Sequence, residues 1–77
     1  MSRLPVTTSK KLEKILLHLG FIIVRQKGSH VFYRHPDGRY TTLPHHAGED
    51  LGRSLTRQIL REIQISPELF IQLLNEV

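Results

Sequence analysis

The sequence predicts an α+β domain: a helix, a three-stranded antiparallel sheet, a helix and a C-terminal helix. Apolar residues recur at helical spacing near the start and again in the second half of the chain. Three short runs rich in β-branched and aromatic residues lie between them, joined by two glycine-containing turns. A length of 77 residues favours one domain over residues 1–77, with a thin core.

The first helix is expected at residues 8–19. Thr7 or Thr8 can cap its start, and Gly20 suits the left-handed position that ends it. Its apolar stripe has the spacing i, i+3, i+4, i+7 and consists of Leu12, Ile15, Leu16 and Leu19. Away from this stripe lies a basic face, the lysine face, formed by Lys10, Lys11 and Lys14 with His18 on the same side. Such a face is either solvated or in contact with phosphates, since lysine suits both.

The three strands are expected at residues 21–27, 30–34 and 39–43. Gly28-Ser29 joins the first two, because glycine adopts a positive φ without steric cost. His35-Pro36-Asp37-Gly38 is a strong signal for the second turn. On the middle strand, one face carries His30, Phe32 and Arg34, and the other carries Val31, Tyr33 and His35. Since both faces hold an aromatic residue, the pattern does not decide which one is buried.

This arrangement places His30 where a tight turn leads into a strand, with Lys27 just before the turn. An imidazole that exchanges a proton near neutral pH, beside a fixed cation, suits chemistry on a phosphodiester. The alternative is a polar surface histidine or one held by structural hydrogen bonds.

Pro44 is expected to stop the third strand, and His45-His46 follows in a loop. Two adjacent histidines suggest a metal site, but zinc sites usually combine spaced histidines with cysteine or acidic ligands. The chain has no His-x-x-x-His spacing and no cysteine, so neither a thiolate site nor a disulfide can form. We therefore expect no metal and no cofactor.

A second helix is expected at residues 51–63, with an apolar face of Leu51, Leu55, Ile59 and Ile63. The opposite face carries Arg53, Arg57 and Arg61, which could be solvated, pair with Glu62 or Asp50, or hold phosphates. Ser66-Pro67-Glu68 is a clear start for the last helix. Its apolar side consists of Leu69, Phe70, Leu73, Leu74 and Val77.

The charge is uneven, because residues 1–48 carry +6 and residues 49–77 carry −2, for a net charge of +4. A basic first part favours a polyanionic partner such as nucleic acid. No apolar run is long enough to span a bilayer, and the first residues lack the apolar segment of a signal peptide. We expect a cytoplasmic protein with no membrane partner.

The order of elements resembles the double-stranded-RNA-binding fold, and the motifs resemble the HicA-type toxins, the ribonuclease half of HicBA toxin–antitoxin modules. The matching segments run through nearly the whole chain: Leu19-Gly20-Phe21, Gln26-Lys27-Gly28-Ser29-His30, Pro36-Asp37-Gly38-Arg39, Thr42-Leu43-Pro44-His45-His46, the helix carrying Leu55, Ile59 and Leu60, and Ile65-Ser66-Pro67-Glu68-Leu69-Phe70. One departure is Val31, where many members carry a second polar residue, often histidine, after Gly-Ser-His.

The resemblance implies a metal-independent endoribonuclease, or mRNA interferase, that blocks translation. It also implies a HicB-type antitoxin that covers the active site, in a complex that sets the oligomeric state. His30 is the catalytic residue that the resemblance carries over. We expect RNA to be bound by Lys10, Lys11, Lys14, Lys27 and Ser29. Two alternatives stay open: a non-catalytic RNA-binding module, and a structural adaptor for an acidic protein.

Overall fold

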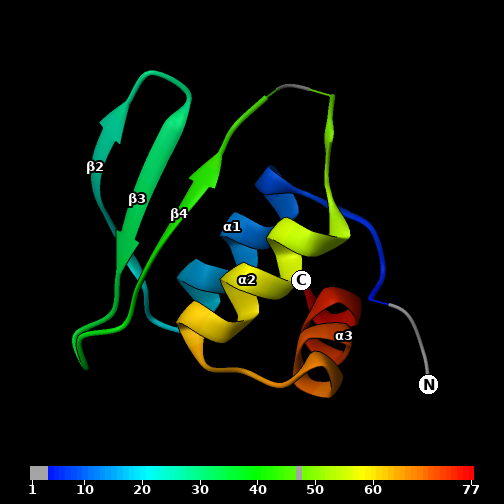
Figure 1. The fold of residues 1–77 in the computed structure, drawn as a ribbon. Coiled ribbons are helices and arrows are strands. Elements are labelled where there is room, and N and C mark those ends of the chain that lie inside the picture. Colours follow the sequence, from blue (N-terminus) through cyan, green and yellow to red (C-terminus); the bar gives the residue numbers. More distant parts are fainter. Residues whose placement is uncertain (1–3, 47) are drawn as a thin grey trace.

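The computed structural model describes residues 4–46 and 48–77, and its elements follow the expected order (Figure 1). They are β1 (Thr7–Thr8), α1 (Ser9–His18), β2 (Ile22–Lys27), β3 (His30–Arg34), β4 (Tyr40–Pro44), β5 (Asp50–Leu51), α2 (Arg53–Ile63) and α3 (Pro67–Glu76). This confirms the predicted α+β class, with a helix, a three-stranded antiparallel sheet and two further helices. None of the described helices is long and apolar enough to cross a membrane.

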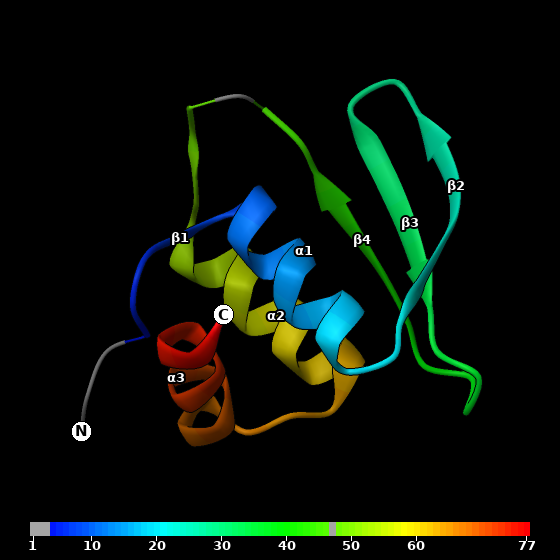
Figure 2. The same cartoon turned by 180° about the vertical axis from the view of Figure 1, so that it is seen from behind.

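The main sheet has the strand order β2-β3-β4, and both pairings are antiparallel. All three helices lie on one side of it, as the two opposite views show (Figures 1 and 2). No helix of the described residues lies on the other side, called the outer face here. The strands β3 and β4 therefore bury one face toward the helices and present the other, whereas β2 is exposed along its whole length.

Burial alternates along β3 and decides which of its faces is inside. Val31 and Tyr33 are buried toward the helices, whereas His30 and Arg34 are exposed on the outer face and Phe32 is half-buried there. Between sheet and helices, the core is formed by Leu12, Ile15 and Leu16 of α1, Ile59, Leu60 and Ile63 of α2, and Phe70 and Leu73 of α3, together with Phe21, Leu43 and others.

The expected start of the second helix at residue 51 was wrong. Leu51 belongs to β5, which pairs with β1 through Thr7 opposite Leu51, and α2 begins only at Arg53 after the cap residue Gly52. Leu51 is buried as expected, but it is buried from a strand. A ribbon of two residues per strand has no periodicity of its own, so the sequence pattern could not reveal it.

Pro44 is the last residue of β4 rather than the residue that stops it. Because β4 is an edge strand of the main sheet, the missing N–H of a proline is tolerated there.

The predicted caps of the first and last helices are confirmed. The Thr8 hydroxyl accepts a hydrogen bond from the N–H of Lys11 (3.2 Å), and Ser66 caps α3 in the same way. Gly20 follows α1 with φ at +100°. A Cβ at Gly20 would lie 3.1 Å from Nε2 of His35. The connection therefore needs glycine both for its positive φ and for this close approach.

Candidate functional site

His30 is the first residue of β3 and pairs with Lys27 on one side and Pro44 on the other. The turn before it uses Gly28 at φ +60°, the conformation predicted from the sequence. The carbonyl of Ser29 accepts a hydrogen bond from the N–H of His45 (2.6 Å), which fixes the tip of this hairpin to the loop after β4. The backbone of His30 is thus held on both sides.

The His30 side chain is exposed and makes no hydrogen bond or ion pair with the part of the chain that the structure describes. It lines a hollow of about 330 Å³ between the edge strand β4 and α2. The other lining residues are Tyr40, Thr42, Pro44, Leu55, Gln58, Ile59 and Glu62. Glu62 accepts hydrogen bonds from Thr41 (2.8 Å) and Gln58 (3.5 Å), which hold its carboxylate at the rim. The ring of His30 is therefore free to meet a ligand.

Two of the other histidines have structural partners. His35 contacts the carbonyl of Leu19 through Nε2 (3.1 Å), while its Nδ1 accepts the N–H of Asp37 (3.1 Å). These contacts tie the second turn of the sheet to the end of α1 and explain the histidine in that turn.

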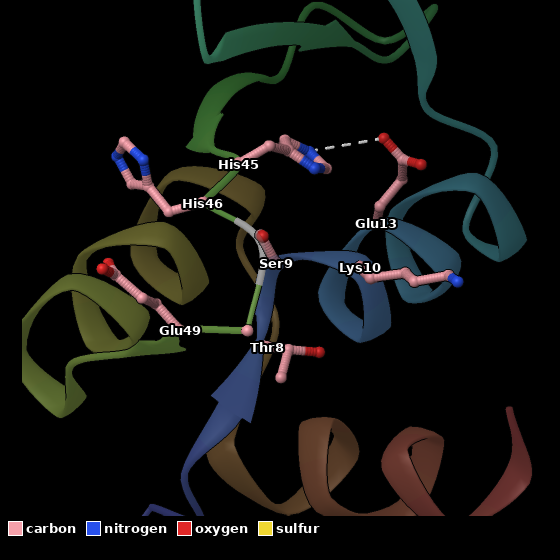
Figure 3. A pocket seen from close by; sticks show the side chains of 8 residues that line it. Thr8, Ser9, Lys10, Glu13, His45, His46 and Glu49 are labelled. Atoms are coloured by element: carbon pink, nitrogen blue, oxygen red, sulfur yellow. Dashed lines mark ion pairs between the residues drawn. The ribbon is translucent and has the colours of Figure 1, made fainter.

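His45 is turned toward the inner side of the sheet, where it lines a second hollow of about 460 Å³ (Figure 3). Its Nε2 lies 2.9 Å from the hydroxyl of Tyr33 and 3.5 Å from Oε2 of Glu13. Tyr33 donates to Glu13, so the proton between His45 and Tyr33 comes from the imidazole. The ring of His46 points away from that of His45.

The hydroxyl of Tyr33 is the buried centre of this network. Burial, the hydrogen bond to Glu13 and the charge of that carboxylate, in this order, raise the pKa of Tyr33 far above its usual value. The sequence did not indicate this group of three, because Glu13 lies in α1, Tyr33 in β3 and His45 in the loop after β4. The only signal in the sequence was that each of these polar side chains lies close to an apolar stripe.

Stability should decline at high pH because of Tyr33. The unfolded chain loses the phenol proton near pH 10, whereas the folded protein keeps it, so rising pH favours the unfolded state. Above about pH 10 we expect Tyr33 alone to lower the free energy of unfolding by up to about 1.4 kcal/mol per pH unit. Urea unfolding at several pH values measures this slope. Tyr33→Phe should flatten it, and Tyr40→Phe, which removes an exposed phenol, should not.

The lysine face and His30 lie in different places. Lys10, Lys11 and Lys14 line a hollow with Thr8 and Val77, and none of these residues lines the hollow of His30. By contrast, Lys27 and Ser29 directly adjoin His30. The predicted RNA-binding residues therefore form two separate groups.

The arginine face of α2 has one defined contact. Arg53 donates to the carbonyl of Leu4 (2.9 Å). Within residues 4–46 and 48–77, Arg57 and Arg61 form no ion pair with Glu62 or Asp50, so solvation and contact with phosphates remain as the alternatives for them. In the same residues, no three histidine, aspartate or glutamate side chains gather as a metal site.

Comparison with known proteins gives one family. The model of the family described as the HicA toxin of bacterial toxin–antitoxin systems matches residues 9–65. The matched segment begins with α1, includes the hairpin of His30 and the whole main sheet, and ends just after α2. No curated protein matches the chain.

Proposed function

The chain belongs to the HicA toxin family of bacterial toxin–antitoxin systems, and from this premise we propose that it is a metal-independent endoribonuclease that cleaves mRNA. Cleavage of messages in the cytoplasm would block translation, and a HicB-type antitoxin would neutralise the enzyme by covering its site. One observation carries the proposal: His30 is exposed, held by backbone pairing on both sides, and adjoins an open hollow. No other histidine of the described chain combines these features.

RNA supplies its own nucleophile. Neutral His30 accepts the proton of a ribose 2′-OH while O2′ attacks the adjacent phosphorus. The P–O2′ bond forms and the P–O5′ bond breaks, which leaves a 2′,3′-cyclic phosphate on one fragment and a 5′-OH on the other. Lys27 is directly opposite His30, so its ammonium can stabilise the charge that develops on the phosphate.

The leaving O5′ must receive a proton. His45 follows the end of β4 and could supply this proton, but its Nε2 is engaged by Tyr33 and Glu13 on the inner side of the sheet. His46 does not line the hollow of His30; it lines the second hollow, with His45. We therefore propose that water protonates the leaving oxygen.

The lysine face has a secondary part in this proposal. Lys10, Lys11 and Lys14 attract the polyanion over a broad surface, because three cations on one side of α1 meet the phosphates of a long message. Their contribution is electrostatic and falls with salt, whereas Lys27 and Ser29 act next to the reacting phosphate.

The products test the chemistry directly. Purified protein incubated with a labelled transcript should give fragments with 5′-OH and 2′,3′-cyclic phosphate ends, at the same rate in excess EDTA. A transcript with a single 2′-deoxyribose at the cleaved position should resist cleavage there only, because it lacks the nucleophile. Loss of cleavage in EDTA would contradict the metal-independent mechanism. Binding without fragments would instead support the non-catalytic RNA-binding module.

A further inference from the structure

The outer face of the main sheet combines aromatic rings with cations. Phe32 and Tyr40 lie on it with ring centroids 6.2 Å apart at an interplanar angle of 40°. The guanidinium of Arg25 lies 4.8 Å from the centre of the Phe32 ring. Arg34 pairs with Tyr40 across the strands, so its side chain is on the same face. These four residues, Arg25, Phe32, Arg34 and Tyr40, are called the aromatic–cation platform here.

All charged residues in the strands of this sheet are basic. The strands β2, β3 and β4 contain Arg25, Lys27 and Arg34 and no aspartate or glutamate. Tyr40 is 49% exposed, so its ring is accessible to a ligand. Within residues 4–46 and 48–77, Arg25 and Arg34 form no ion pair with a carboxylate. Aromatic rings beside such cations are the chemistry that binds unpaired bases and their phosphates.

We propose that the aromatic–cation platform binds single-stranded RNA. The Arg25 guanidinium, which lies over the Phe32 ring, turns to a phosphate, one base stacks on the ring face that it leaves, a neighbouring base stacks on Tyr40, and a second phosphate pairs with Arg34. The inference rests on the proposed function and adds how the substrate is positioned. A double helix cannot use such a platform, because its bases are already stacked on one another. The platform thus selects unpaired RNA.

The position of the platform relative to His30 supports this role. Phe32 is two residues from His30 on the same face of β3, which corresponds to about 6.8 Å along the strand. A base stacked on Phe32 therefore belongs to a nucleotide adjoining the scissile phosphate. The lysine face on α1 lines a hollow that shares no residue with that of His30, so it cannot give this local positioning.

The test measures the binding of an uncleavable single-stranded 2′-O-methyl oligonucleotide, so its result does not depend on catalysis. A second oligonucleotide of the same length has abasic residues at its central positions. Wild-type protein should bind the base-bearing oligonucleotide more tightly. Phe32→Leu and Tyr40→Leu should each weaken that binding by about 5- to 100-fold, and should leave binding of the abasic oligonucleotide within about twofold of wild type.

Lys14→Gln is the matched control, because it removes an interaction with phosphates and none with bases. It should weaken both oligonucleotides equally and reduce the salt dependence of binding. Thermal unfolding of each variant, compared with wild type, confirms that the fold is intact.

Equal affinity of Phe32→Leu, Tyr40→Leu and wild type for the base-bearing oligonucleotide would overturn the inference. So would variants that bind RNA normally but lose affinity for the co-expressed antitoxin, because the platform would then be a protein interface. A parallel cleavage assay separates the two proposals. Wild-type protein that shows the base-dependent binding but cuts no transcript would refute the endoribonuclease alone.

Discussion

His30→Ala is expected to lower the rate of RNA cleavage by about 10²- to 10⁴-fold, the range that a positioned general base usually contributes. The loss should be confined to the chemical step. The imidazole is exposed and contacts no side chain of the described residues through a hydrogen bond, so its removal leaves no buried group unpaired. Single-turnover cleavage of a labelled transcript measures the rate, and urea unfolding should give a midpoint close to that of wild type.

His46→Ala provides the matched control for this experiment. Like His30, His46 is exposed and close to the end of β4, but it does not line the hollow of His30. It should cleave at a rate within about threefold of wild type, since exposed substitutions seldom disturb the fold. If His30→Ala cleaved as fast as His46→Ala, the base would have to be another group, and the hairpin would only bind the substrate.

The position of His30 could be predicted because local rules determine it. Gly28 adopts the positive φ that a tight connection needs, and the strand begins directly after Ser29. The capping residues Thr8 and Ser66 were predictable for the same reason, since a cap depends on its own first turn. Features set by neighbours in the chain were therefore accessible from the sequence.

The features of the fold and the site that the sequence did not reveal depend on tertiary contacts. Tyr33 and Phe32 have similar apolar rings at successive positions, and only the placement of the helices decides that Tyr33 is inside. The contact of Tyr33 with Glu13 and His45 follows from that placement. Likewise, a helical projection identifies the lysine face but cannot tell that it lies apart from His30. Each of these points required the packing of α1 against the sheet.

The last helix, α3, packs into the core although it is not part of the segment that matches the family. Residues 9–65 match the family, so α3 lies outside the matched segment, yet its Phe70 is fully buried and its Leu73 is 5% exposed. Both belong to the same core cluster as Leu12 and Ile15 of α1. Because α1 supports the inner face of the sheet that carries His30, α3 stabilises the site from the opposite side of the core.

Phe70→Ala should therefore destabilise the protein by about 3–5 kcal/mol, the usual cost of emptying a buried phenylalanine site. Domains are stable by about 5–15 kcal/mol, and one this small is expected near the lower limit, so much of the variant should be unfolded at 37 °C. Urea titration gives the free energy of unfolding.

Leu69→Ala on the same helix, at a position 36% exposed, should cost much less. Equal losses in the two variants would mean that α3 contributes through helix formation rather than core packing. At low temperature, the folded fraction of Phe70→Ala should still cleave RNA at the wild-type rate, because Phe70 supports the scaffold and does not touch the hollow of His30.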